Sequence, residues 1–208
     1  MSDLVFYTNP MSRGRIARWM LEEVGAPYDT RVLQYGPEMK SPDYLAINPM
    51  GKVPAIVHKG QVVTEAAAIC AYLALSFPEA GLAPTDDERA DFFRWLFFAA
   101  GPGEAAITNQ SFGFHVPDDD EARGRAGYGC FDDMVNALEG MLADGRDHVC
   151  GARFTAADVY VGAQISWGLE FGTLPERPGF ADYAKRLASR PAAKRANEMD
   201  NALMPKQG

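Results

Sequence analysis

The sequence predicts two domains, an α/β domain followed by an all-helical one. Short apolar, β-branched runs that suit strands occur only before about residue 80. A helical pattern separates the first two of these runs, as parallel strands require. A segment rich in proline and glycine, Phe77–Pro84, then interrupts the chain where its composition changes. We therefore expect a first domain at residues 1–78, a linker at 79–86 and a helical domain at 87–208.

The first domain begins with a β-α-β pattern. Leu4–Tyr7 is a short apolar run that ends at a Thr-Asn-Pro loop, and Ser12 is placed to cap the helix that follows. Apolar residues then recur at helical spacing, while Arg13, Arg15 and Arg18 take the other face. Gly25 and a proline end this helix, and a second strand is expected at 28–33.

The rest of the first domain predicts a hairpin and a further helix. A short helical turn is expected at 41–45, strands at 53–57 and 62–63, and an alanine-rich helix at 65–75. This order of elements is typical of a thioredoxin-like half-sandwich, so the fold class is α/β.

The second part contains only helical signals. Asp86 and Asp87 are expected to cap a long helix, and Gly101-Pro102-Gly103 to break or kink it. A helix is expected at 121–143, and two short ones at 182–189 and 192–201. Thr155 and Asp158 have the spacing of a capping box, which is a structural role.

Composition limits the functions that the chain can have. Its 208 residues are 47% hydrophobic and carry a net charge of −8, most of it in the second part. This charge argues against nucleic acid and anionic membranes as partners. Three cysteines without close spacing predict neither a disulfide framework nor a metal motif, and they suit a reducing compartment. With no basic-then-apolar leader and no apolar run of membrane length, we expect a cytoplasmic protein.

The hairpin and the helix after it have the chemistry of a peptide-binding site. Pro54 stands at the first residues of a strand, where its bond to Val53 is free to be cis, and a cis bond would offer the N–H and C=O of Val53 to a guest peptide. The helix start at Glu65 and Ala66 would attract a carboxylate, and the Glu65 side chain would hold an ammonium group. The guest would be a small peptide with a free α-amino acid end; the alternative is a plain hairpin that leads into a helix.

Two segments carry a resemblance to a known family. Gly51-Lys52-Val53-Pro54-Ala55-Ile56 and Thr64-Glu65-Ala66-Ala67-Ala68-Ile69 resemble the glutathione-binding core of the cytosolic glutathione S-transferases, in which serine usually replaces Ala66. A run from Ser12-Arg13 through Trp19 to Leu21-Glu22-Glu23 resembles a bacterial and fungal branch of that family. The resemblance covers essentially the whole chain. It implies the transferase fold, glutathione as co-substrate, a homodimer and a role in detoxification.

The resemblance also implies the site residues. The hydroxyl that activates the glutathione thiol would be Ser12, with Tyr7 and Thr8 as alternatives; otherwise Ser12 is a simple helix cap and Tyr7 a core aromatic. The residues expected to bind glutathione are Lys40, Lys52, Val53, Pro54, Glu65 and Ala66. Lys40 and Lys52 would bind the glycine carboxylate, and Glu65 the γ-glutamyl ammonium. Alanine at position 66 removes a hydroxyl donor but keeps the backbone N–H, so it weakens this site.

The expected reaction is attack of the glutathione thiolate on a small hydrophobic electrophile, without a metal. One alternative is glutathione-dependent reduction of disulfides or peroxides, and another is a non-catalytic binding protein on the same fold. Phe112, Phe114 and Trp167 either line the electrophile pocket or belong to the core. Cys70 is expected to be a buried apolar residue, and the three histidines to lie in turns or on the surface.

Overall fold

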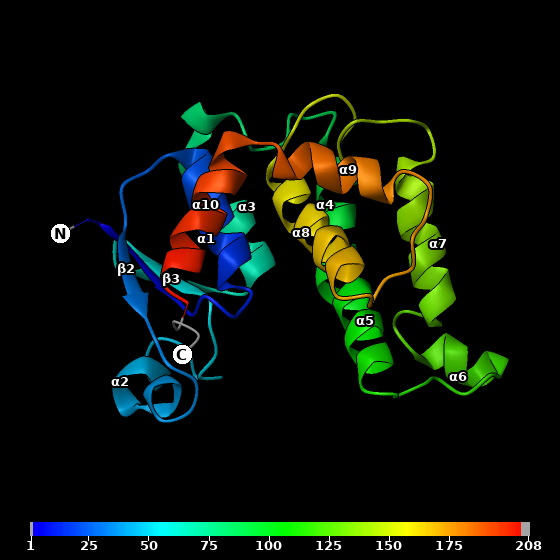
Figure 1. Ribbon diagram of the computed structural model, residues 1–208, viewed down its shortest axis with the longest axis horizontal. Helices are drawn as coiled ribbons and strands as arrows, with labels where there is room; N and C mark the ends of the chain where they lie inside the picture. The colour runs from blue at the N-terminus through cyan, green and yellow to red at the C-terminus, as the bar shows by residue number, and fades with distance from the viewer. Residues whose placement is uncertain (1, 205–208) are drawn as a thin grey trace. The chain divides into compact units, whose positions relative to one another are not determined.

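A four-stranded sheet of order β2-β1-β3-β4 forms the centre of the first half of the protein (Figure 1). The computed structural model describes residues 2–204. The strands are β1 (Leu4–Thr8), β2 (Asp29–Val32), β3 (Ala55–His58) and β4 (Gln61–Thr64). The pair β1–β2 is parallel, and the pairs β1–β3 and β3–β4 are antiparallel. The predicted thioredoxin-like arrangement is confirmed, with strand bounds that shift by up to two residues.

Helices cover this sheet and connect its strands. They are α1 (Gly14–Val24), α2 (Pro42–Leu45), α3 (Ala66–Ser76) and α10 (Pro191–Ala202), with short 3-10 turns η1 (Glu38–Lys40) and η2 (Pro78–Ala80). Helix α1 ends at Gly25, which adopts φ 67° and donates its N–H to Leu21, as its glycine predicts. The hairpin between β3 and β4 turns at Lys59 and Gly60, both with positive φ, which matches the twist of the two strands.

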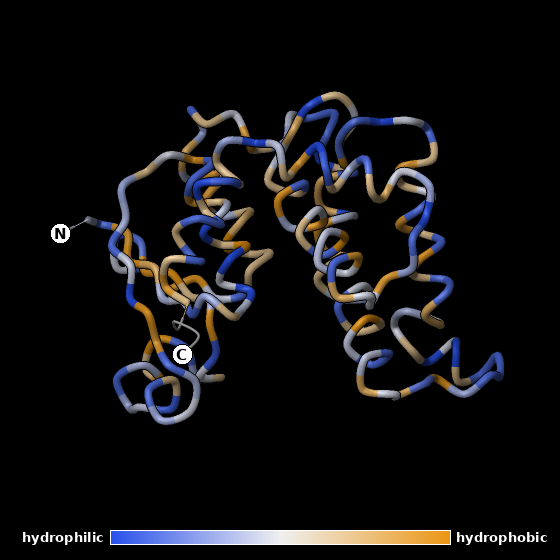
Figure 2. The backbone as a smooth tube through the Cα atoms, in the orientation of Figure 1, coloured by the Kyte–Doolittle hydropathy of each residue, from blue (hydrophilic) through white to orange (hydrophobic). Residues whose placement is uncertain are grey.

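The core of this half lies between the sheet and the apolar sides of α1 and α3. Leu4 and Phe6 of β1 and Ile56 of β3 are buried, and Figure 2 shows hydrophobic, orange segments within the sheet. Helix α1 contributes one apolar face, and α3 is apolar on all sides. The buried residues of α1 that pack here are Ile16, Ala17, Met20, Leu21 and Val24.

Helix α10 belongs to the first unit, whereas the sequence analysis expected all of residues 87–208 to form the helical domain. The described residues up to Ala83 and from Ser189 onward form one compact unit, and Pro84–Ala188 form the other. Figure 1 shows α10 beside α1. Small side chains allow this contact, because Ala192, Ala193 and Ala196 are buried, and Asp200 is buried against Arg18. Sequence pattern alone placed α10 in the helical domain.

The second unit is helical. Its helices are α4 (Arg89–Phe98), η3 (Ala99–Gly103), α5 (Glu104–Ser111), α6 (Asp120–Arg125), α7 (Phe131–Leu142), α8 (Ala156–Glu170) and α9 (Phe180–Ala188). The capping box of α8 is confirmed: the Thr155 N–H donates to Asp158 Oδ2 at 2.8 Å, and both residues are fully buried. Between residues 2 and 204, no helix is long and apolar enough to cross a membrane.

Two of three further expectations for this unit were wrong in detail. Asp86 and Asp87 do not cap α4, because the chain first turns at Thr85, whose N–H donates to Glu88, and the helix begins at Arg89. The Gly-Pro-Gly segment, expected to break or kink the helix, does interrupt it: α4 ends at Phe98, and the π-helical turn η3 leads into α5. The helix expected at 121–143 is two helices, because the chain leaves the helical conformation at Ala126, with φ −74° and ψ 126°, and becomes helical again only at Phe131.

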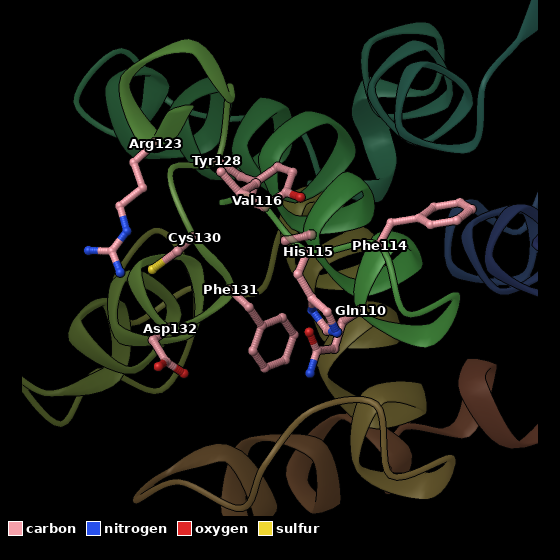
Figure 3. A pocket seen from close by; sticks show the side chains of 10 residues that line it. Gln110, Phe114, His115, Val116, Arg123, Tyr128, Cys130, Phe131 and Asp132 are labelled. Atoms are coloured by element: carbon pink, nitrogen blue, oxygen red, sulfur yellow. The ribbon is translucent and has the colours of Figure 1, made fainter. Parts of the chain in front are cut away.

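A pocket of about 240 Å³ lies within the second unit, between the end of α5 and the start of α7 (Figure 3). Phe114 lines it, and Phe112 stacks edge-on against Phe114 with 5.8 Å between ring centroids. Both rings are largely exposed, so they are not core residues. Trp167 does not line this pocket.

Candidate active site

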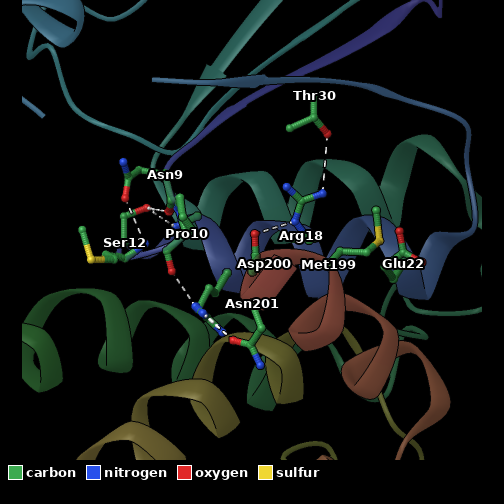
Figure 4. Close-up of polar contacts among 12 residues, drawn as sticks. Asn9, Pro10, Ser12, Arg18, Glu22, Thr30, Met199, Asp200 and Asn201 are labelled. Atoms are coloured by element: carbon green, nitrogen blue, oxygen red, sulfur yellow. Dashed lines mark hydrogen bonds and ion pairs between the residues drawn. The ribbon is translucent and has the colours of Figure 1, made fainter. Parts of the chain in front are cut away.

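Ser12 lies in the loop between β1 and α1, at the start of the helix. Its Oγ accepts a hydrogen bond from the N–H of Gly14 at 2.9 Å and donates one to the carbonyl of Asn9 at 2.7 Å (Figure 4). The helix cap itself is Arg13, without a side-chain cap, so the expected capping role of Ser12 is displaced by one residue. Ser12 is half-buried, and its hydroxyl is in contact with the positive end of the helix dipole.

Thr8 and Tyr7, the alternatives to Ser12, have different surroundings. Thr8 is 0% exposed, and its hydroxyl faces the Cα of Gly14 so closely that a side chain at Gly14 would collide with it. Tyr7 points to the opposite side of β1, because side chains alternate along a strand. Its ring is tilted against that of Tyr44 with 5.6 Å between centroids.

The loop before β3 leaves one residue with unused backbone groups. The Val53–Pro54 peptide bond is cis, as the sequence allowed. The preceding carbonyl, that of Lys52, accepts from Tyr44 Oη and from Asn48 Nδ2, each at 2.7 Å. Within the described part of the chain, neither the N–H nor the C=O of Val53 enters a hydrogen bond. The backbone N–H and C=O of Val53, which lies in a bend just before β3, are therefore open to pairing with another peptide.

Glu65 occupies a strained position at the start of α3. Its φ of 64° and ψ of 118° are rare for a residue with a side chain, and such conformations cluster at ligand sites. The side chain is exposed, and it makes no hydrogen bond or ion pair with any residue between 2 and 204. Ala66 follows as the first, buried residue of α3, so the free N–H groups of the first helical turn lie beside the Glu65 carboxylate.

The two predicted lysines differ in their surroundings. Lys40 is engaged: its Nζ donates to the carbonyl of Met50 at 2.7 Å and lies against Gly51, which has φ 57°. Lys52 is exposed and lies one residue before Val53. Lys40 therefore fixes the shape of the loop that presents Lys52 and Val53.

Cys70 and His58, which the sequence analysis discussed, are not among the residues of this site. Burial raises the pKa of the Cys70 thiol well above its ordinary value, in agreement with the expectation of a buried apolar residue. His58 is 5% exposed, so the expectation of a turn or surface residue was wrong; its ring stacks on Phe77 and hydrogen-bonds Tyr72 at 3.0 Å. Among residues 2–204, no cluster of three metal-ligating side chains occurs.

Two residues that the sequence analysis did not single out hold the Ser12 loop. Asn9 accepts the N–H of Met11 through Oδ1 at 2.9 Å and donates through Nδ2 to the carbonyl of Leu33 at 2.8 Å. Arg15 donates through Nε to the carbonyl of Pro10 at 2.6 Å. The Asn-Pro pair was a signal for an ordered turn, whereas nothing in the sequence distinguished Arg15 from the other arginines of α1.

Comparison with known proteins decides the family. The family described as Glutathione S-transferase, N-terminal domain, matches residues 11–75. Glutathione S-transferase GstA of Escherichia coli O157:H7 is 32% identical over 154 residues, which span 72% of this chain and 74% of GstA. The chain belongs to the glutathione S-transferase family. Drosophila melanogaster Glutathione S-transferase D7 is 29% identical over 175 residues, covering 80% of this chain and 75% of that protein.

Solved glutathione S-transferases share the fold along the whole chain. A sphingomonad enzyme complexed with glutathione has a TM-score of 0.74 at 28% identity and covers 95% of this chain and 98% of its own. The transferase URE2P6 of Phanerochaete chrysosporium, in complex with oxidized glutathione, has a TM-score of 0.77 at 25% identity, with 98% of both chains covered. The protein is thus a glutathione S-transferase with glutathione as its co-substrate.

Proposed function

We propose that this transferase ionises the glutathione thiol at Ser12 and directs the thiolate at a small apolar electrophile. A free thiol has a pKa near 8.5, so it is mostly protonated at neutral pH. A hydroxyl donor and the positive end of a helix both favour the anion. The observation that carries the proposal is the half-buried hydroxyl of Ser12 at the first turn of α1, bonded to the N–H of Gly14.

The hydroxyl of Ser12 is free to change partner without leaving an acceptor unpaired. It now donates to the carbonyl of Asn9, but that carbonyl also accepts the backbone N–H of Ser12 at 3.1 Å. Rotation of the hydroxyl toward a sulfur atom would therefore leave Asn9 satisfied. Thr8 Oγ1 has no hydrogen-bond partner among residues 2–204, but Thr8 is fully buried and its hydroxyl is enclosed against Gly14, which argues against its reaching a bound thiol.

The rest of glutathione would lie along the first unit. The unpaired N–H and C=O of Val53 would bond the backbone of the tripeptide, as in strand addition at a sheet edge, with Pro54 shaping that edge. The N–H groups at Ala66 would receive the γ-glutamyl carboxylate, and Glu65 its ammonium. Lys52 would attract the glycine carboxylate, and Lys40 would support that loop.

In the transfer step the thiolate sulfur forms a bond to an electrophilic carbon. The bond from that carbon to its leaving group breaks, and the leaving group departs with the electron pair. The glutathione proton leaves to solvent when the thiol ionises, so the enzyme supplies no redox equivalent. Reduction of a disulfide by the same thiolate is the competing activity.

The test compares Ser12→Ala with Thr8→Val and Tyr7→Phe, and with Ser12→Thr as the variant that keeps a hydroxyl. We expect Ser12→Ala to lower kcat/KM for chlorodinitrobenzene by about 10²-fold, the usual effect of losing one donor to a reacting anion. The pKa of bound glutathione, read from the pH dependence of thiolate absorbance, should rise. Unchanged turnover and thiol pKa in Ser12→Ala would remove the proposal. Turnover of hydroxyethyl disulfide alone would indicate a reductase, and turnover of neither substrate a binding protein.

We also propose that the transferase works as a homodimer in the cytoplasm. Helix α3 has no charged residue, and its Leu75 is 61% exposed. On α4, Phe93 and the 70% exposed Phe97 form an aromatic pair one helical turn apart. Apolar faces of this kind are typical of subunit contacts. Leu75→Glu and Phe97→Glu should convert the dimer to a monomer in analytical ultracentrifugation.

The proposed location in the cytoplasm is supported by the three free cysteines, which suit a reducing compartment.

A further inference from the structure

The loop that carries Ser12 is held through its backbone carbonyls. The carbonyl of Asn9 accepts from the N–H and the hydroxyl of Ser12. The carbonyl of Met11 accepts from Tyr35 Oη at 3.0 Å, and that of Ser12 from the N–H of Arg15 at 3.2 Å. Each of these contacts is local or comes from the segment after β2. The position of the Ser12 hydroxyl depends on this set.

Within the described part of the chain, the fourth carbonyl of this loop, that of Pro10, accepts a hydrogen bond from a single side chain. Arg15 donates to it through Nε at 2.6 Å, and Pro10 is buried. The same guanidinium donates through Nη2 to Asn201 Oδ1 at 2.8 Å (Figure 4). Arg15 therefore joins the Ser12 loop to the last turn of α10, which is 186 residues away in the sequence.

Helix α10 is a fixed support for this link. Arg18 Nε pairs with Asp200 Oδ1 at 2.7 Å, next to Asn201 in the sequence. At the other end of α10, Arg190 forms a two-point contact with Glu23, at 2.7 and 2.8 Å. Because α10 is held at both ends, Asn201 has little freedom to follow Arg15 if the loop shifts.

We propose that Arg15 is a positioning residue for the thiol site: with Asn201 it anchors the Pro10 carbonyl, so that the C-terminal helix α10 sets the position of the Ser12 hydroxyl. This inference rests on the proposed role of Ser12. A hydrogen bond to the sulfur is effective only over a narrow range of geometry, and displacement of a reacting group by about 1 Å costs up to 10²-fold in rate. Because Arg15 is the donor to this part-buried carbonyl among residues 2–204, its loss leaves the carbonyl without a donor from these residues and favours movement of the loop.

The experiment uses the full chain with Arg15→Ala, Arg15→Lys and Asn201→Ala. Arg195→Ala is the matched control, because Arg195 also links α10 to α1 but does so at Glu22, far from the loop. The readouts are kcat/KM with chlorodinitrobenzene, the pKa of bound glutathione and the Kd for glutathione.

We expect Arg15→Ala to raise the thiol pKa by about one unit, equivalent to a tenfold loss of thiolate stabilisation, with a Kd for glutathione within about threefold of wild type. Asn201→Ala should shift the thiol pKa in the same direction by less, although it keeps the charge of Arg15. Arg15→Lys should fall between wild type and Arg15→Ala, since an ammonium group cannot bridge both partners as the guanidinium does. Arg195→Ala should leave the thiol pKa unchanged.

The inference is overturned if Ser12→Ala raises the thiol pKa while Asn201→Ala leaves it at the wild-type value. An effect of Arg15→Ala without one of Asn201→Ala would assign the role to the charge of Arg15 rather than to the link with α10. If Ser12→Ala has no effect, it is the proposed function that fails. Asn201 is exposed, so its alanine variant tests the inference even if Arg15→Ala does not fold.

Discussion

Arg18 and Asp200 form an ion pair inside the protein, with 2.7 Å between Nε and Oδ1 and exposures of 1% and 0%. Arg18 also lies over the Phe6 ring and donates to Tyr28 Oη at 3.1 Å. Two atoms of the pair, Arg18 Nη2 and Asp200 Oδ2, have no hydrogen-bond partner among the described residues. Burial raises the pKa of Asp200 even with Arg18 beside it. The pair therefore joins α1 to α10 at a considerable desolvation cost.

This pair predicts an asymmetry between single and double substitutions. Asp200→Ala should lower the free energy of unfolding by about 3–5 kcal/mol, because it leaves the Arg18 charge buried without a counterion. Arg18→Met combined with Asp200→Leu should lose much less, since apolar side chains of similar size remove both desolvation costs. Urea denaturation of the four proteins measures the cycle. A double variant as unstable as Asp200→Ala would contradict this account.

Local patterns predicted most elements of the first unit but not the place of α10. The apolar runs of β1 and β3 and the glycine at 25 are signals read within a few residues. The contact of α10 with α1 joins segments far apart in the sequence, and its buried face consists of small alanines that carry little periodic signal. The arginines of α1 read as a polar, solvent-facing side, yet Arg18 is buried because Asp200 reaches it from α10.

The candidate site likewise contains some residues that the sequence predicted and others that it did not. Val53 and Glu65 could be predicted because each stands at a boundary between elements, where turn and cap residues are visible in the sequence, whereas the role of Ser12 was predicted from the family resemblance. The link from Pro10 through Arg15 to Asn201 was not predicted, since it depends on three segments meeting in space. Alanine at 66 was visible as a departure from the family pattern, and the structure leaves its backbone N–H at the start of α3.

The buried carboxylate of Asp158 holds the second unit together, and its partners predict a graded loss of stability. Oδ1 accepts from the N–H of Val149 at 2.7 Å and from Tyr183 Oη at 2.9 Å, while Oδ2 accepts from Thr155. Tyr183→Phe should cost about 1 kcal/mol, because Oδ1 keeps one donor. Asp158→Ala should cost more than about 3 kcal/mol, since several buried donors lose their acceptor at once. Thermal or urea unfolding measures both; equal losses would exclude a shared network.

Because of His58, we predict that the free energy of unfolding of the protein falls on mild acidification. Burial lowers its pKa from the ordinary 6.5, with Lys59 acting in the same direction and Asp3 opposing. The unfolded state therefore binds the proton more readily than the folded state. The contribution to stability is complete above about pH 6.5 and declines as the pH falls toward the folded-state pKa.

The matched variant for this prediction is His58→Asn, which keeps a hydrogen-bonding group for Tyr72 but does not titrate. Between pH 7.5 and 5.5, the free energy of unfolding should fall more steeply in the wild type than in the variant. Urea denaturation at three pH values within this range is sufficient. Parallel pH profiles would show that His58 titrates alike in the folded and unfolded states.

We predict that replacing Ala66 by the serine that is usual in the family raises the affinity for glutathione. Ala66→Ser would add a hydroxyl donor at the start of α3, where the γ-glutamyl carboxylate is proposed to bind. A net hydrogen bond contributes about 0.5–1.5 kcal/mol, so the Kd for glutathione should fall by roughly 2- to 10-fold. Isothermal titration calorimetry measures the change, with Ala68→Ser, an exposed position further along α3, as the control. An unchanged Kd would place the carboxylate elsewhere.

We predict that Glu65 lowers the stability of the protein through its backbone conformation while its carboxylate contributes to glutathione binding. Its φ of 64° is costly for any residue with a side chain, by the order of 1–3 kcal/mol, but not for glycine. Glu65→Gly and Glu65→Ala both remove the carboxylate, so both should weaken glutathione binding by about 10- to 100-fold, as expected for a hydrogen bond to a charged group. Glycine relieves the strain but loses about 0.5–1 kcal/mol more chain entropy on folding than alanine, so Glu65→Gly should be about 1 kcal/mol more stable than Glu65→Ala in urea. Equal stability would mean that the strain does no more than offset this entropy loss, whereas unchanged binding in both would remove Glu65 from the site.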